Sequence, residues 1–162
     1  MAHELASTVA RLAGLLASEN FPTFERAALK RMVPGQAPPV VFYRLAFHHL
    51  PQGWERQEAS WQTILAGMAM MAPQIHRPDR PLGQVLAETD YSEARLERLL
   101  RAEGEVLSTL FLRLCRFLAA KAQPFNWCEA ASLLLVREHD KRERINLKIA
   151  RDFYRHQKTT ET

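Results

Sequence analysis

The stretch "VLSTLFLRLCRFLAAKA", residues 106–122, decides the fold class, because its large apolar residues recur every three or four positions. This spacing places one apolar stripe along a single face of an α-helix. The stripe consists of Val106, Leu107, Leu110, Phe111, Leu114 and Leu118. Strand-like alternation of apolar and polar residues is nearly absent elsewhere in the chain. We therefore predict a buried helix here and an all-α fold.

Proline and glycine divide the rest of the chain into short helical segments. Stripes with the same period run from Leu5 to Leu16 and from Trp61 to Met71. Turns are expected near residues 34–39 and 51–54, and the stretch "APQIHRPDRP" at 72–81 forms a longer break. We predict two small helical bundles, residues 1–80 and 81–162, joined near residues 72–90.

Local signals predict where several helices begin and end. Asp90 and Glu93 have capping-box spacing at the start of one helix, and Gly104 would end that helix. Asp140 would be the N-cap of the last helix, with Glu143 in the reciprocal capping position.

The composition describes a basic, globular protein. The 162 residues are 47% hydrophobic, and 22 Lys and Arg against 18 Asp and Glu give a net charge of +4. Seventeen of the 22 basic residues are arginine, which suits bidentate contact with phosphate and stacking on bases. The excess favours a polyanion partner, with ordinary surface ion pairs as the alternative.

Other sequence features bear on the cellular compartment. Cys115 and Cys128 are the only cysteines, and neither has metal-ligand spacing, so a disulfide framework is not expected. The N-terminus lacks a signal-peptide pattern, and no stretch approaches membrane-spanning length. We predict a cytoplasmic protein without a membrane partner.

The apolar stripes place several arginines on exposed helix faces. Arg98 and Arg101 lie opposite a core face that contains Leu96 and Leu99. Arg113 and Arg116 fall outside the stripe of the next helix, and Lys121 lies just beyond it. No acidic residue occurs between Val106 and Cys128, so these three residues have no partner nearby in sequence. This unpaired basic stretch favours a functional surface.

A second basic group opens the last helix. Lys141, Arg142 and Arg144 stand in the first turn, where the helix dipole disfavours positive charge. Three cations beside exposed amides would favour a bound phosphate. The alternative is neutralisation by neighbouring acids, namely Glu138, Asp140 and Glu143.

No catalytic arrangement is visible. The histidines lack metal-binding spacing, and neither a Gly-rich phosphate loop nor a nucleophile elbow occurs. A hydrolase that uses His139 with Glu138 or Asp140 is the remaining enzymatic hypothesis, and a surface histidine is the simpler interpretation. We predict a non-enzyme with no catalytic residue, no metal site and no cofactor.

An ordered set of motifs resembles one family. The set comprises "FYRL" at 42–45, "LGQVLAE" at 82–88, "EARLERLLRAE" at 93–103, "LCRFLAAKAQPFNW" at 114–127 and "KRERINLKIARDF" at 141–153. Together they resemble the CasB family, the small subunit of the type I-E CRISPR effector complex called Cascade. The resemblance implies a non-catalytic helical subunit, present in two copies, that contacts the CRISPR RNA assembly and other Cascade subunits and helps to hold target DNA open as an R-loop.

The resemblance also implies a basic binding surface. Its residues here are Lys30, Arg31, Arg101, Arg116, Lys141, Arg142 and Arg144. A basic residue would be expected where Cys115 stands, which makes Arg113 and Lys121 possible substitutes. Arg44 in "FYRL" matches the family too, but a buried structural ion pair is an equal interpretation. Asn126 stands where the family has aspartate and can still cap a helix.

The predicted function is therefore electrostatic. Arginines of both bundles would follow the backbone of DNA and CRISPR RNA on one side of the protein, without reading sequence. Holding the displaced strand would stabilise the R-loop, whose formation is a near-balanced exchange of duplexes. The alternative from another class is a helical adaptor whose basic face docks an acidic protein.

Overall fold

The computed structural model describes residues 2–158 and is built from helices alone. No strand occurs within this range, and the all-α prediction is confirmed. The helices are α1 (Ala2–Ala17), α2 (Thr23–Lys30), α3 (Val40–His49), the 3-10 helix η1 (Trp54–Gln57), α4 (Glu58–Met71), α5 (Leu82–Glu88), α6 (Glu93–Arg101), α7 (Gly104–Ala120), α8 (Trp127–Leu135) and α9 (His139–His156).

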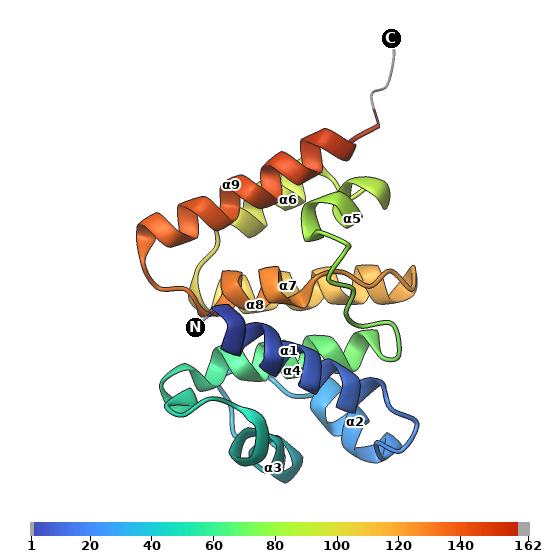
Figure 1. Cartoon of the computed structure of the whole chain (residues 1–162), viewed down its shortest axis with the longest axis vertical. Coiled ribbons are helices and arrows are strands. Elements are labelled where there is room, and N and C mark those ends of the chain that lie inside the picture. Colours follow the sequence, from blue (N-terminus) through green and yellow to red (C-terminus); the bar gives the residue numbers. More distant parts are fainter. Residues whose placement is uncertain (1, 159–162) are drawn as a thin grey trace.

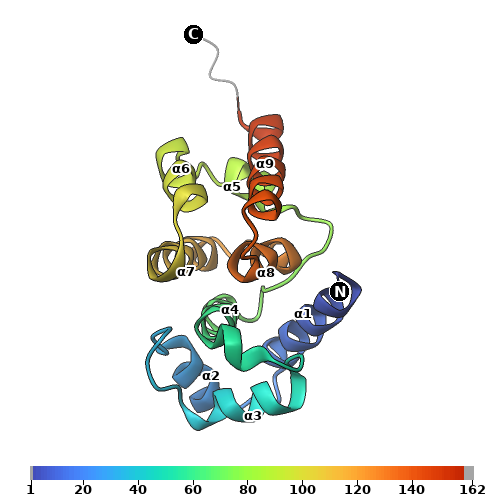
Figure 2. The same cartoon turned by 90° about the vertical axis from the view of Figure 1, so that its left-hand side faces the viewer.

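The helices form three layers. Helices α1 to α4 lie at one end, α7 and α8 lie in the middle, and α5, α6 and α9 lie at the other end (Figures 1 and 2). Helix α4 packs on α7 and α8, and every residue from Trp61 to Ala69 is buried. A helix that is apolar on all sides is one surrounded by protein, so α4 joins the first layer to the second.

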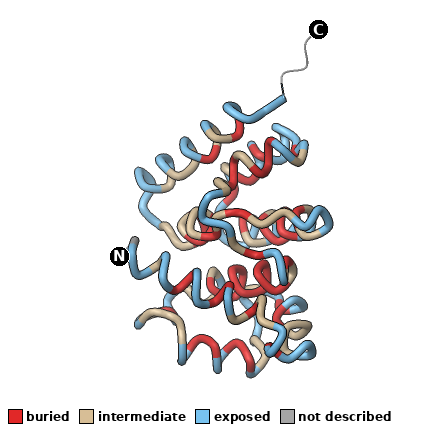
Figure 3. Tube along the Cα trace, turned by 45° about the vertical axis from the view of Figure 1, so that its right-hand side comes forward, coloured by how far each residue is buried: buried red, intermediate tan, exposed pale blue. Residues whose placement is uncertain are grey.

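The apolar stripe of α7 has the predicted role. Leu107, Phe111, Leu114 and Leu118 are buried, whereas Val106 at the start of the stripe is 60% exposed. Buried positions follow the inner sides of the helices in every layer (Figure 3). One continuous cluster of buried apolar side chains includes residues from both halves of the chain. The division at residues 80 and 81 into separate bundles stays a prediction.

The start of α6 differs from the prediction. Ser92, not Asp90, is the N-cap, and its hydroxyl accepts a hydrogen bond from the Arg95 amide at 3.2 Å. Asp90 has a φ of 61°, which places it in the turn after α5 and not in the extended conformation of an N-cap. The predicted capping box of Asp90 and Glu93 is therefore wrong.

Two further helix boundaries differ from the predicted ones. Gly104 does not end α6, which stops at Arg101. With its φ of 56°, Gly104 instead opens α7 in a conformation that glycine adopts at little cost. Helix α9 begins at His139, so Asp140 lies inside its first turn and is not the predicted N-cap. Glu138 is the N-cap, and its side chain makes no capping hydrogen bond.

Asn126 does cap α8, because its side-chain oxygen accepts a hydrogen bond from the Cys128 amide at 3.0 Å.

The predicted break at 72–81 connects the layers and is attached to the segment before α8. The Arg77 amide donates to the Phe125 carbonyl at 3.0 Å, and the Trp127 amide donates to His76 Nδ1, also at 3.0 Å. Only an unprotonated Nδ1 can accept this bond, so the contact requires neutral His76 in this tautomer. Burial likewise lowers the pKa of His76, although a backbone contact at Phe125 acts in the opposite direction.

We expect His76 to make stability depend on pH. Because its folded pKa lies below the unfolded value, its contribution is complete above about pH 6.5 and is lost as the pH falls toward the folded pKa. His76→Asn keeps an acceptor oxygen and removes the titration. When the pH is lowered from neutral to mildly acidic, urea unfolding should therefore show a smaller loss of unfolding free energy for the variant than for the parent. Equal losses would contradict this role.

Candidate nucleic-acid interface

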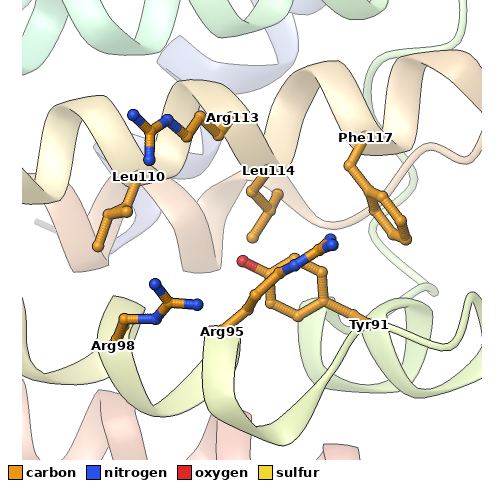
Figure 4. Close-up of a pocket in the computed structure, with 7 residues that line it drawn as sticks. All are labelled: Tyr91, Arg95, Arg98, Leu110, Arg113, Leu114 and Phe117. Carbon is orange, nitrogen blue, oxygen red and sulfur yellow. The ribbon is translucent and has the colours of Figure 1, made fainter.

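A groove between α6 and α7 gathers three arginines. It encloses about 280 Å³ and is lined by Tyr91, Arg95, Arg98, Leu110, Arg113, Leu114 and Phe117. Arg95 and Arg98 extend from α6 toward α7, and Arg113 lies on the α7 side of the gap (Figure 4). We call this feature the α6–α7 groove.

Helix periodicity explains how the arginines reach the groove. Arg95 and Arg98 are one turn apart and alternate with Leu96 and Leu99, which point into the core. On α7, Arg113 directly precedes Leu114, which is also buried. The long arginine side chains therefore border the apolar seam that joins the two helices.

The groove carries positive charge without a local acid. No Asp or Glu lines it, and within residues 2–158 neither Arg95, Arg98 nor Arg113 forms an ion pair with a carboxylate. Three like charges repel one another, and an anion placed among them relieves that repulsion. The groove is therefore suited to a phosphate or another anion.

Aromatic rings meet cations at one end of the groove. The Arg95 guanidinium carbon lies 5.7 Å from the centre of the Tyr91 ring and 5.6 Å from the centre of the Phe117 ring. Lys121 Nζ lies 5.1 Å from the centre of the same Phe117 ring. Burial raises the pKa of Tyr91 despite the opposing charges of Arg95 and Arg98, so the phenol stays neutral. These contacts orient the cations without neutralising them.

The remaining predicted residues of α6 and α7 are exposed. Arg116 follows Arg113 by one turn and forms no ion pair within the described part of the chain. Arg101 follows Arg98 by one turn and forms a 3.2 Å ion pair with Glu97, in which the side chains are 79% and 66% exposed. Such an exposed pair is weak and can exchange for a phosphate contact.

Lys141 and Arg144 belong to a different hollow. They line a space of about 850 Å³ together with residues of α1 and α8, including Leu5 and Leu135. Figure 2 shows α8 and α9 on one side and α6 and α7 on the other. Lys141 also forms a 3.5 Å ion pair with Glu138, as the neutralisation hypothesis expects. The prediction that this group and the α6–α7 arginines form one continuous surface stays untested.

Arg142 is directed into the protein. Its guanidinium donates to the carbonyl oxygens of Leu100 and Ala102, both at 3.0 Å, and to that of Leu99 at 3.4 Å. Asn146 adds a further bond to the Leu100 carbonyl at 3.0 Å. The last carbonyls of a helix lack partners within the helix, so Arg142 caps the C-terminus of α6 from α9. We therefore leave Arg142 out of the proposed binding surface.

We expect Arg142→Ala to lower the free energy of unfolding by about 1–3 kcal/mol, because it deprives partly buried carbonyls of a charged donor. Urea unfolding followed by circular dichroism measures the loss. Arg144→Ala is the matched control, since its exposed side chain should change stability by no more than about 0.5 kcal/mol. Equal stability of the two variants would argue against the capping role.

The basic residues of the first layer lie elsewhere. Lys30 and Arg31 are exposed at the C-terminal end of α2, in the layer opposite α6 (Figure 1). Arg44 forms a bidentate ion pair with Glu25 at 2.6 and 2.7 Å, which joins α3 to α2 and lowers the pKa of Glu25. Arg44 is 46% exposed, so this pair is structural but not buried.

The hydrolase hypothesis gains no geometric support. His139 is 83% exposed, and its Nε2 lies 3.9 Å from a carboxylate oxygen of Glu143, a residue that the hydrolase hypothesis does not use. Within residues 2–158, no cluster of three or more His, Cys, Asp or Glu side chains could hold a metal ion. Cys115 is fully buried, so its position does not belong to the protein surface. Burial also raises the pKa of its thiol.

Sequence reasoning did not select Arg95 or Arg98 as site residues. The spacing of Tyr91, Arg95 and Arg98 places a ring and two guanidinium groups on consecutive turns, and this was the available signal. What the sequence does not contain is the pairing of α6 with α7, which brings Phe117 and Arg113 to the same groove.

The comparison with protein families decides the identity. Residues 25–154 match the family described as CRISPR-associated protein Cse2. The chain belongs to the Cse2 family. Cse2 is the CasB family of the sequence analysis, so the predicted resemblance is confirmed, and membership makes this chain a subunit of a type I-E Cascade complex. The matched range includes the α6–α7 groove and the basic group at Lys141, Arg142 and Arg144. A search of the curated proteins finds no match.

None of the described helices combines the length and the apolar character that crossing a bilayer requires.

Proposed function

We propose that this Cse2 chain is a non-catalytic subunit that binds the sugar-phosphate backbones of DNA and CRISPR RNA and so stabilises the R-loop. The observation that carries the proposal is the α6–α7 groove, which is lined by Arg95, Arg98 and Arg113 and by no carboxylate. Arginine forks match phosphate oxygens and cannot lose their charge at cellular pH. In the complex, guide pairing reads the sequence and this subunit contributes attraction for any backbone.

The exposed arginines outside the groove extend the same surface. Arg116 continues the row on α7, and Arg101 continues the row on α6. Two copies of the subunit, together with other Cascade subunits, would lengthen the path that a displaced strand can follow. Because an R-loop is nearly balanced against the closed duplex, a few phosphate contacts are enough to shift the equilibrium.

The test is the lifetime of an R-loop on reconstituted Cascade. Complexes that carry the triple variant Arg98→Gln, Arg113→Gln and Arg116→Gln should keep their guide RNA and other subunits but release target DNA faster than the parent complex. An unchanged R-loop lifetime would contradict the proposal. If the basic face instead docks an acidic protein, the variant should fail to join the complex, and the isolated parent should bind no nucleic acid.

A further inference from the structure

The walls of the α6–α7 groove combine two kinds of chemistry. Arginines border it, whereas Leu110, Leu114 and Phe117 supply apolar surface. The backbone of a duplex presents phosphates and sugars and keeps the faces of its bases stacked inside. Positively charged side chains alone would be enough to bind a duplex backbone. An apolar wall strengthens binding only if the ligand also buries apolar surface against it, as the bases of a single strand do.

The aromatic end of the groove can bind a planar ligand. The Arg95 guanidinium lies near the rings of both Tyr91 and Phe117 and has no carboxylate partner in the groove. A base stacks on a guanidinium plane as it does on an aromatic ring. Phe117 is only partly buried and is also contacted by Lys121, which extends the positive charge along α7.

The size of the groove agrees with one nucleotide-sized group. A volume of about 280 Å³ lies near the lower end of the range of small-ligand sites, about 300–1,000 Å³. A duplex cannot enter a hollow of this size and would contact only the outer arginines. The groove and the outer arginines therefore present different surfaces to single and double strands.

We propose that the α6–α7 groove is a single-strand site, in which phosphates lie against Arg98 and Arg113 and one unstacked base lies against Arg95 beside Phe117. This inference rests on the proposed function and adds a preference to it. Duplex backbones are held by exposed residues such as Arg101 and Arg116, whereas the groove recognises a strand whose bases are free. Stacking of this kind tolerates every base, so the site does not read sequence.

Charge-conserving variants separate base stacking from phosphate attraction. Arg95→Lys keeps the positive charge and removes the planar group, and Phe117→Leu keeps apolar packing and removes the ring. Each should weaken binding of an oligothymidine strand by about tenfold, the lower part of the range measured for stacked bases. Neither should change the affinity for a duplex of the same length or the salt dependence. Arg116→Gln is the control and should weaken both ligands together.

The deciding measurement is fluorescence anisotropy of the full chain with three probes of equal length: oligothymidine, an abasic single strand and a duplex. The parent should bind oligothymidine about tenfold more tightly than the abasic strand, and Arg95→Lys should remove that difference. Equal binding of the two single strands by the parent would overturn the single-strand site and leave the proposed function intact. Binding of none of the three probes would overturn both. If Phe117→Leu does not fold, Arg95→Lys and the abasic probe still decide.

Discussion

Gly83→Ala is expected to lower the free energy of unfolding by about 3 kcal/mol, a large share of the roughly 5–15 kcal/mol that holds a typical domain together. Gly83 lies in α5 where α5 crosses α9. An added Cβ would overlap the Ile149 carbonyl oxygen and lie 2.8 Å from the Phe153 nitrogen and 2.9 Å from Asp152 Cβ. Two of these atoms belong to the α9 backbone, which cannot move aside without separating the two helices.

The consequence would reach the binding surface. Ile149 and Phe153 are the buried residues of α9, and Arg142 on the same helix caps α6. Displacing α9 therefore removes both apolar packing and the donor that satisfies the end of α6. Gly14→Ala is the matched control, because Gly14 lies inside α1 with no heavy atom within 4 Å of its added Cβ. It should stabilise by about 0.5–1 kcal/mol. Urea unfolding that finds Gly83→Ala as stable as the parent would contradict the close crossing.

The triple variant Arg98→Gln, Arg113→Gln and Arg116→Gln is expected to weaken binding of single-stranded DNA about a hundredfold at low salt. This figure takes about 1 kcal/mol for each lost phosphate contact. The salt dependence of single-strand binding should also become shallower, by about 0.7 units of slope per lost contact. Stability should change little, since these side chains are exposed and have no ion-pair partner within the described residues. Anisotropy titrations at several salt concentrations measure both quantities.

A control with the same loss of charge separates a local site from general attraction. Arg11, Arg151 and Arg155 are exposed on α1 and α9 and do not line the α6–α7 groove, and their replacement by glutamine also removes three positive charges. This control should lose much less affinity than the triple variant of Arg98, Arg113 and Arg116. Equal losses would mean that net charge, and not the arrangement of Arg98, Arg113 and Arg116, accounts for binding.

The fold class could be predicted because it depends on local periodicity. The stripe from Leu107 to Leu118 determines one buried face of α7 whatever the helix packs against. Helix ends were harder, because a cap depends on the conformation of a single residue. Asp90 has the right side chain for a cap but takes a left-handed conformation, and the neighbouring Ser92 caps instead.

The role of Arg142 illustrates why the site was only partly predictable. In sequence it is one of three cations in the first turn of α9, indistinguishable from Lys141 and Arg144. Only the packing of α9 beside the end of α6, about forty residues earlier, turns its guanidinium inward. The same tertiary pairing brings Arg95 and Arg98 opposite Arg113, a juxtaposition that no spacing along the chain contains.

The salt dependence of binding tests the central claim most directly. The affinity of the full chain is measured for two unrelated single-stranded DNAs of equal length between about 50 and 200 mM salt. We expect equal affinities for the two sequences and a linear fall of log K with log salt, with a slope of about −2 or steeper for three or more phosphate contacts. Binding that ignores salt, or that distinguishes the two sequences, would contradict a sequence-independent phosphate interface.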